Sequence, residues 1–244
     1  MDFVSGEIFA IDKPLGWTSF DAVKRLRGAI QRRLHVKKFK VGHAGTLDPM
    51  ATGVLVICTG RATRQIEGIQ SGVKEYVATL RLGATTPSFD LETGIDARYP
   101  YEHITLELIE EKLPAFRGKI MQVPPLYSAV KVDGKRAYDL ARKGKDAELK
   151  AKPLEITALE VLEYDPPLLK LRVECSKGTY IRALARDIGE SLGSGAHLTA
   201  LRRTRVGDFS AERTLSMEQA AALIAHASLE FPDWYEQNKK QNDL

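Results

Sequence analysis

The spacing of apolar and polar residues predicts short helices and strands that follow one another irregularly along the chain. Apolar residues recur at helical spacing in residues 18–34, 105–116, 184–192 and 216–224. Strands are predicted at residues 7–12, 73–83, 117–123, 154–164, 169–175 and 198–209. Because several strands are adjacent in sequence, we expect an α+β fold with a mixed, mostly antiparallel central sheet and flanking helices.

Capping signals indicate where two of the helices begin. Thr18 stands three residues before Asp21, and Ser216 stands three residues before Gln219, which is the spacing of a capping box. The first helix is expected to turn an apolar stripe inward and to leave most of its basic residues on the surface. The stripe consists of Phe20, Val23, Leu26, Ile30 and Leu34.

Residues 40–55, with the sequence K-V-G-H-A-G-T-L-D-P-M-A-T-G-V-L, hold the one local concentration of Gly, His, Thr and Asp. Glycines allow sharp turns and a close approach to a ligand, and Pro49 pushes Asp48 out of helical geometry. Asp48 is therefore expected in an extended or turn conformation. On composition alone, such a stretch is also typical of an ordinary surface turn.

A second notable segment is the basic stretch at residues 124–152. Asp133-Gly134 predicts a tight hairpin, and a short basic helix is expected around Leu140. The cations in or near this segment include Lys131, Lys135, Arg136 and Arg142, and tyrosines lie among them. A projecting basic hairpin with aromatic residues is typical of a nucleic-acid clamp, although a basic run can also be a solvated helix face.

The composition of the chain limits which class of protein it can belong to, but it says little about which reaction the protein catalyses. The chain has 244 residues, 43% of them hydrophobic, and a formal net charge of +4, which alone is a weak argument for nucleic-acid binding. It shows no long apolar run and no secretory leader, so we expect a cytoplasmic protein without a membrane contact. Cys58 and Cys175 are predicted to be reduced core thiols, and no metal-ligand spacing is present.

Several familiar chemistries have no motif in this chain. There is no phosphate-binding loop, no dinucleotide-binding glycine pattern, no H-E-x-x-H and no G-x-S-x-G elbow. His43 is a lone histidine and proves little by itself. Asp48 remains as a loop carboxylate near cations in sequence, and an aspartate can act as a covalent nucleophile toward an electrophilic carbon.

Four sequence motifs of this chain are similar to those of a known family. The strings I-D-K-P-L-G-W-T-S-F-D, K-V-G-H-A-G-T-L-D-P-M-A-T-G-V-L, K-E-Y-V-A-T-L-R-L-G and C-S-K-G-T-Y-I-R-A-L-A-R-D-I-G occur in this order. Together they resemble the motifs of bacterial tRNA pseudouridine-55 synthases. The resemblance extends from about residue 7 to about residue 215 and includes the hairpin string P-P-L-Y-S-A-V-K-V-D-G-K-R-A-Y.

The resemblance implies roles for individual residues. Asp48 matches the catalytic aspartate, Tyr76 the tyrosine that packs on the target base, and Arg182 the arginine that pairs with the aspartate. Without the resemblance, Tyr76 would be interpreted as a core tyrosine, because it shares a strand face with apolar residues. The residues with implied substrate-binding or supporting roles are His43, Leu201, Lys13 and Tyr180, together with the hairpin cations Lys131, Lys135, Arg136 and Arg142.

The implied reaction converts a uridine in the T stem-loop of tRNA to pseudouridine. It breaks the N1–C1′ bond, rotates the uracil and forms a C5–C1′ bond, with no redox change, so no cofactor is expected. A stacked base must first be flipped out, and stacking against an aromatic side chain offsets the energy that this unstacking costs. Attack by Asp48 at C1′, attack at C6 and abstraction of a sugar proton all remain open.

The domain layout is expected to differ from that of most family members. Residues 1–230 form the predicted catalytic domain, with the basic insertion at about 124–152 and a polar tail at 231–244, and the family's usual C-terminal RNA-binding domain is expected to be absent. No obligate protein partner is expected. The alternatives are the catalytic subunit of a guide-RNA-dependent pseudouridine synthase, a non-catalytic RNA-binding or RNA-folding protein, and, least favoured, a two-carboxylate glycosidase.

Overall fold

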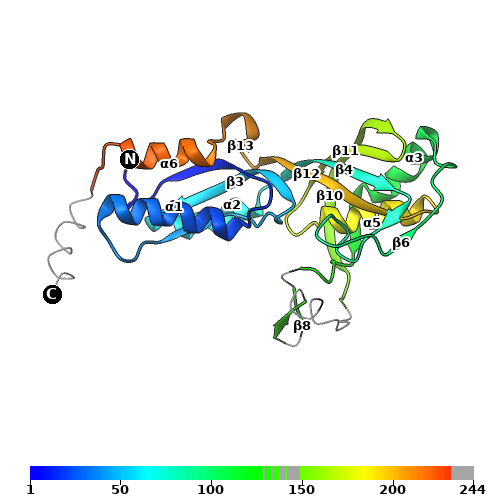
Figure 1. Cartoon of the computed structure of the whole chain (residues 1–244), viewed down its shortest axis with the longest axis horizontal. Helices are drawn as coiled ribbons and strands as arrows, with labels where there is room; N and C mark the ends of the chain where they lie inside the picture. Colours follow the sequence, from blue (N-terminus) through cyan, green and yellow to red (C-terminus); the bar gives the residue numbers. More distant parts are fainter. Residues whose placement is uncertain (129, 133, 138–140, 142–148, 232–244) are drawn as a thin grey trace. The chain divides into compact units, whose positions relative to one another are not determined.

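A computed structural model describes residues 1–128, 130–132, 134–137, 141 and 149–231 (Figure 1). The chain divides into two compact units, which are described separately: unit 1 comprises Met1–Gly72 and Arg203–Leu244, and unit 2 comprises Val73–Arg202. Strand β12 (Ala196–Val206) runs across the boundary. Among the helices of the described ranges, none combines the length and the apolar character that a bilayer-spanning segment requires.

Unit 1 combines an antiparallel group of strands with two main helices. Its elements from the first segment are β1 (Ile8–Lys13), α1 (Ser19–Leu34), β2 (Val41–His43), β3 (Ala51–Thr59), the 3-10 helix η1 (Gly60–Gln65) and α2 (Ile66–Ser71). The second segment adds the end of β12, β13 (Phe209–Ser210), the 3-10 helix η3 (Ala211–Arg213) and α6 (Met217–His226). Helices α1 and α6 pack against each other.

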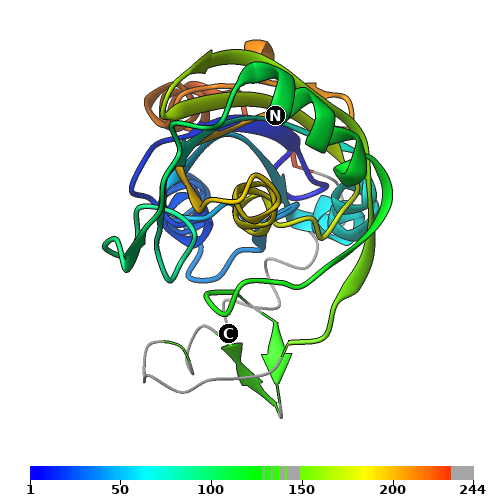
Figure 2. The same ribbon diagram turned by 90° about the vertical axis from the view of Figure 1, so that its right-hand side faces the viewer.

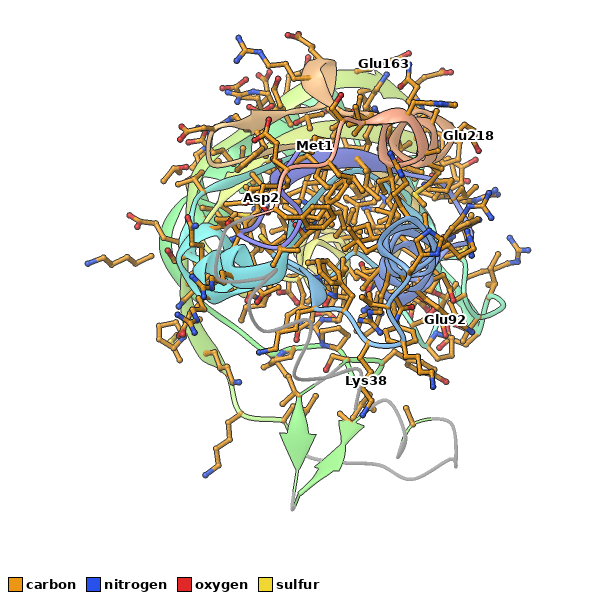
Figure 3. All side chains as sticks on the ribbon, turned by 90° about the vertical axis from the view of Figure 1, so that its left-hand side faces the viewer. Met1, Asp2, Lys38, Glu92, Glu163 and Glu218 are labelled. Carbon is orange, nitrogen blue, oxygen red and sulfur yellow. The ribbon has the colours of Figure 1, made fainter. Side chains whose placement is uncertain are left out.

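Strand β3 organises the sheet of unit 1. It pairs antiparallel with β1 from Ile8 opposite Cys58 to Lys13 opposite Gly53, and β2 pairs antiparallel with its last residues, 57–59. Residues 51–59 are almost all buried, which is why this segment is continuously apolar instead of alternating. Figure 3 shows side chains filling the interior of the molecule, while the labelled Lys38 and Glu218 lie at its periphery.

Helix α1 confirms its predicted cap and corrects part of its predicted stripe. Thr18 and Asp21 form the full capping box, but Phe20 is 60% exposed. The buried face instead begins with two small residues, Ser19 and Ala22. The Ser19 hydroxyl exchanges hydrogen bonds with the backbone of Leu47, and this close approach leaves no room for a bulky side chain on that side of the first turn.

Unit 2 contains a second antiparallel group of strands. Its elements are β4 (Lys74–Leu82), β5 (Ala84–Thr85), β6 (Ala97–Arg98), α3 (Leu106–Lys112), the 3-10 helix η2 (Leu113–Phe116), β7 (Gly118–Gln122), β8 (Lys131–Val132), β9 (Lys135–Arg136), β10 (Lys152–Asp165), β11 (Leu168–Cys175) and α5 (Ile181–Ser191). The strand order is β12-β4-β11-β10-β7, and β4, β11, β10 and β7 pair antiparallel in turn.

The two helices of unit 2 follow their predicted signals in part. Thr105 caps α3 at the start of the predicted range 105–116, but Leu106, the first apolar residue of that range, is 40% exposed. The helix α5 is viewed end-on in Figure 2, within the curve of the strands of its unit. Seven of its residues are buried, and they include Arg182. The α+β class with a mostly antiparallel sheet and flanking helices is thus confirmed.

The predicted basic hairpin exists as a two-stranded sheet of its own, β8 with β9. Lys131 lies opposite Arg136, and Val132 lies opposite Lys135. Gly134 has a φ of +79° at the turn, a conformation that glycine adopts readily. The helix expected around Leu140 and all but the first residue of the predicted polar tail at 231–244 lie outside the described residues.

Candidate active site

Asp48 lies in the irregular segment between β2 and β3, as the glycines and Pro49 predict. Gly45 and Gly53, on either side of it, have φ values of +100° and +101°. At Gly53 a Cβ atom would overlap the backbone of Arg203, so only glycine fits there. A hydrogen bond of 3.0 Å from the Ala51 N–H to the Asp48 carbonyl closes the turn. The backbone of the loop is therefore well defined.

The start of α1 and the turn before it anchor this loop. The Leu47 N–H donates to the Ser19 hydroxyl at 2.8 Å, and this hydroxyl donates to the Leu47 carbonyl at 3.1 Å. The Gly16 N–H donates to the Pro49 carbonyl at 2.9 Å. The residues on both sides of Asp48 are thus held by backbone and hydroxyl groups of the segment that connects β1 to α1.

Arg203 supports the same loop from strand β12 and was not identified from the sequence. Its side chain is almost fully buried in unit 1. The guanidinium donates hydrogen bonds to three carbonyl oxygens, those of Val54 at 2.8 Å, Gly45 at 3.0 Å and Thr46 at 3.3 Å. A planar fork with several N–H donors can join three carbonyls at fixed positions, which the single ammonium of lysine cannot reproduce. Arg203 is a positioning residue for the Asp48 loop.

Lys13 is a buried cation whose charge acts on Asp48. Its side chain is 0% exposed, and its ammonium donates to the carbonyls of Trp17 at 2.6 Å and Pro14 at 3.0 Å. Burial lowers the pKa of Lys13 to about 8, against an opposing attraction from Asp48 and with a smaller repulsion from Arg203. Lys13 therefore both fixes the turn before α1 and places a positive charge near the carboxylate of Asp48.

His43 is the last residue of strand β2, directly before the loop that carries Asp48. It is partly buried, and its pKa lies below the usual value, first because of burial and then because of the positive charge of Arg203. The imidazole is accordingly neutral at pH 7. A neutral ring can stack on a nucleobase or share a hydrogen bond with RNA without carrying a charge.

In unit 2, Tyr76 lies on the inward face of β4, as the alternation predicts. It is 8% exposed, shares that face with buried Ala78, Leu80 and Leu82, and lies opposite Val173 of β11. Its burial agrees with the core interpretation. Its role at a target base stays a prediction.

Arg182 is held at the start of α5 by groups of its own unit. Its guanidinium donates to the Tyr127 carbonyl at 2.8 Å and the Ser88 carbonyl at 3.2 Å, and its Nε lies 3.7 Å from an Asp90 carboxylate oxygen. Asp90 is itself buried and accepts from the Ser88 hydroxyl at 2.6 Å. The sequence indicated neither Ser88 nor Asp90. The pairing of Arg182 with Asp48 stays a prediction.

The other predicted contact residues of unit 2 lie at the start of α5, on β12 and in the hairpin of β8 and β9. Tyr180 caps α5, and the buried Gln122 side chain clamps its backbone, accepting from its N–H at 2.9 Å and donating to its carbonyl at 3.2 Å. Leu201 is partly buried on β12. Lys131, Lys135 and Arg136 are known by their backbone pairing only, and Arg142 lies outside the described residues.

No group of three or more His, Cys, Asp or Glu side chains in the described part of the chain lies close enough together to hold a metal ion. The cluster around Asp48 is instead one carboxylate with the cations Lys13 and Arg203 and a neutral His43. Such a set can stabilise an ionised aspartate, and an ionised aspartate can act as a nucleophile or a base.

Comparison with known proteins places the chain in one family along most of its length. The model of the TruB family pseudouridylate synthase (N terminal domain) matches residues 31–181. The model of the tRNA pseudouridylate synthase B C-terminal domain matches residues 182–231. The expected absence of a separate C-terminal RNA-binding domain, like the domain limits 1–230, stays a prediction.

Two curated proteins with high sequence identity to this chain share one name. The tRNA pseudouridine synthase B of Phocaeicola vulgatus is 62% identical over 239 residues, which are 98% of this chain and 97% of the relative. The protein of the same name from Bacteroides fragilis is 60% identical over 233 residues, which are 96% of this chain and 100% of the relative.

Solved structures agree on the fold. A Cbf5-Nop10-Gar1 complex contains a chain that is 31% identical, with a TM-score of 0.67, and the match covers 99% of this chain and 58% of that one. In the archaeal box H/ACA sRNP Nop10-Cbf5 complex, the matching chain is 27% identical with a TM-score of 0.62. That match covers 97% of this chain and 56% of the other. This chain thus spans just over half the length of these structural relatives. On the family models and the curated identities, the chain belongs to the TruB family of pseudouridylate synthases.

Proposed function

We propose that this pseudouridine synthase isomerises the uridine at position 55, in the T loop of tRNA, with Asp48 as the catalytic residue. The observation that carries the proposal is the identity of about three residues in five with relatives named tRNA pseudouridine synthase B. The reaction balances without a cofactor. The N1–C1′ bond breaks, a C5–C1′ bond forms, C5 loses its proton and N1 gains one.

The surroundings of Asp48 support its assignment. A carboxylate that acts as nucleophile or base must be ionised and held in place, and the loop is tied down on both sides of it. Lys13 supplies a positive charge inside the same unit. Arg182, whose fork is held by the Ser88 and Tyr127 carbonyls beside the Asp90 carboxylate, carries the planar guanidinium that can contact a second carboxylate in bidentate fashion.

The remaining residues are proposed to bind RNA. Tyr76 stacks on the flipped uracil, and Leu201 and Tyr180 line its pocket. The neutral His43 supports the T loop from which the base has left. The hairpin cations at Lys131, Lys135, Arg136 and Arg142 neutralise backbone phosphates.

The test uses a T stem-loop RNA with a single uridine at position 55 and detects pseudouridine by chemical labelling, because the product has the same mass as the substrate. Asp48→Asn should abolish turnover while leaving RNA binding within a few-fold of wild type. Asp208→Asn, which changes an exposed aspartate of the same unit, should leave turnover unchanged. Turnover by Asp48→Asn, or modification of an RNA whose uridine stands elsewhere, would contradict the proposal.

A guide-RNA-dependent activity is the second candidate, because the solved neighbours come from Cbf5-containing complexes. Their identities of 27% and 31% are about half those of the relatives named for tRNA. The same stem-loop assay separates the two candidates. Turnover by the isolated chain without any added guide RNA supports the tRNA activity, and a strict requirement for a guide would favour the alternative.

A further inference from the structure

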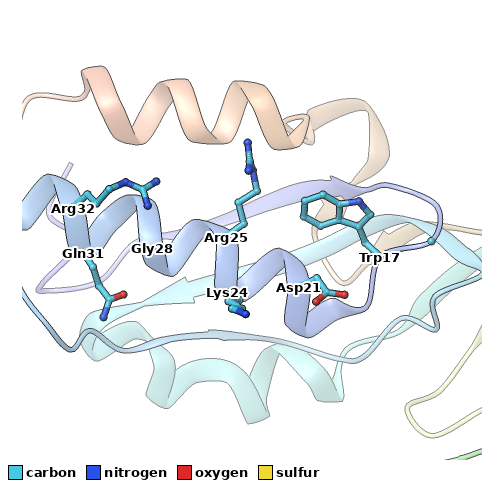
Figure 4. Close-up of a pocket in the computed structure, with 8 residues that line it drawn as sticks. Trp17, Asp21, Lys24, Arg25, Gly28, Gln31 and Arg32 are labelled. Atoms are coloured by element: carbon cyan, nitrogen blue, oxygen red, sulfur yellow. The ribbon is translucent and has the colours of Figure 1, made fainter.

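The outer face of α1 carries an open trough that belongs entirely to unit 1 (Figure 4). Its volume is about 720 Å³, and its walls include Trp17, Asp21, Lys24, Arg25 and Arg32. A second hollow of about 620 Å³ shares Arg32 with the first and continues to Lys37. The two hollows form one channel along the helix.

Gly28 creates the depression in the middle of this face. Figure 4 shows Arg25 and Arg32 on the edge that faces α6, and Lys24 on the other edge, with Gly28 between them. A Cβ atom at Gly28 would meet only the Arg32 guanidinium, at 3.5 Å, so the space above this glycine is free of backbone. The trough is shallow and elongated, which suits a polymer better than a small ligand.

The trough carries a net positive charge, because Lys24, Arg25 and Arg32 stand in its wall with one acid, Asp21. Lys24 and Arg32 are exposed and form no ion pair with any described residue. Arg25 is near the acidic Glu218 of α6. The carboxylate of Asp21 accepts from the Thr18 hydroxyl at 2.6 Å and the Thr18 N–H at 3.0 Å. These bonds lower the pKa of Asp21, and the nearby charge of Lys24 lowers it further.

One end of the trough adjoins the loop that carries Asp48. Gly16, which lines the trough, donates its N–H to the Pro49 carbonyl, one residue after Asp48. Lys13 holds the carbonyl of Trp17, the aromatic residue at this end. From there the channel follows the 16 residues of α1, a length of about 24 Å at 1.5 Å per residue. The trough and the Asp48 loop are thus neighbours in unit 1, joined through the Gly16–Pro49 hydrogen bond.

We propose that this trough binds the ribose-phosphate backbone of tRNA outside the T stem-loop, with Lys24 and Arg32 on phosphates and Trp17 against a ribose or base. The inference rests on the proposed function, because it extends the substrate of the same site. A net positive groove with an aromatic residue at one end has the features that bind single RNA strands without sequence readout. Continuity with the Asp48 loop favours RNA over an anionic membrane.

The main test reverses two charges, Lys24→Glu with Arg32→Glu, and compares full-length tRNA with the isolated T stem-loop. For full-length tRNA we expect at least tenfold weaker binding at about 0.1 M salt and a salt slope that is shallower by about two. The affinity for the isolated stem-loop should stay unchanged. The control Arg213→Glu reverses an exposed charge elsewhere in unit 1 and should change neither affinity.

A second variant fills the trough without changing its charge. Gly28→Gln should weaken full-length tRNA binding several-fold, while glutamine favours the helix more than glycine and so preserves the fold. Unchanged affinity for full-length tRNA in both variants would overturn the proposal. So would an equal loss for tRNA and stem-loop, or binding to anionic vesicles that these variants abolish while tRNA binding persists. Binding is measured without turnover, so a failure of the proposed isomerase activity is seen separately.

Discussion

Arg203→Met should loosen the loop that carries Asp48 while leaving the surface of the protein unchanged. Methionine keeps much of the length of the side chain but none of its N–H groups. Three carbonyl oxygens, those of Gly45, Thr46 and Val54, then lose their donor. The first two belong to the loop, and the third belongs to strand β3.

The size of the effect follows from these contacts. A hydrogen bond to a charged donor contributes roughly 1.5 to 3 kcal/mol, so three bonds give about 4.5 to 9 kcal/mol. Removing a buried guanidinium also removes its desolvation cost, which is several kcal/mol. The loop carbonyls can turn toward water, so the net loss in the free energy of unfolding should be about 3 kcal/mol. Arg203→Lys keeps the charge and should lose about half as much.

The assay pairs urea unfolding with single-turnover kinetics on a T stem-loop under conditions where each variant is folded. We expect Arg203→Met to lower the single-turnover rate by at least tenfold with RNA affinity little changed, because the loop is misplaced and the RNA contacts remain. Arg213→Met removes an exposed arginine of the same unit and serves as the control. A stability within 0.5 kcal/mol of wild type together with an unchanged rate would refute the argument.

Three further predictions concern buried groups of unit 1. Burial lowers the pKa of Lys13 from 10.5 to about 8 in the folded protein, so between these values the unfolded chain holds a proton that the folded chain has released. The free energy of unfolding should therefore rise with pH across this window, by up to roughly 3 kcal/mol relative to Lys13→Met; a constant difference between pH 8 and pH 10 would contradict this. Burial raises the pKa of Cys58 to about 11, and native protein at pH 8 should resist alkylation at this thiol until denaturant is added, as mass spectrometry would show. Gly53→Ala should cost about 4 kcal/mol or more in urea unfolding, because the added methyl group overlaps the Arg203 backbone. Gly178→Ala, at a φ of +85° with open space around it, should cost only the backbone strain of about 1 to 2 kcal/mol.

Local signals predicted much of the fold because they act over a few residues. The capping boxes at Thr18 and Ser216 are present, and the strand alternation at residues 73–83 and 169–175 corresponds to buried and exposed faces. Phe20 was misplaced because helical spacing alone cannot show that the first turn packs closely on the Leu47 backbone. That contact depends on a residue nearly thirty positions away.

The candidate site was predicted unevenly for a similar reason. Motif resemblance assigned roles to Asp48 and Arg182, which lie inside continuous strings, and these roles stay predictions. Arg203, Asp90 and Gln122 are buried polar residues whose partners are distant backbone or side-chain groups, and no periodicity marks such a position. Burial of a polar side chain is visible only when the carbonyls that satisfy it are in place.

The bonds of Arg203 also determine when the Asp48 loop can be completed during synthesis. The Asp48 loop is translated early, but the side chain that fixes it is made about 150 residues later, and the same distance separates β3 from the final part of β12 that lies beside it. At about 5 to 20 residues per second, a ribosome needs at least several seconds between the two. Until then the loop has its contacts with Ser19 and Gly16 but lacks the bonds from Arg203. With Asp48 as the proposed catalytic residue, we expect no activity on RNA before more than 200 residues have left the ribosome. Catalytic competence thus arrives late in translation, and it is timed by chain order alone.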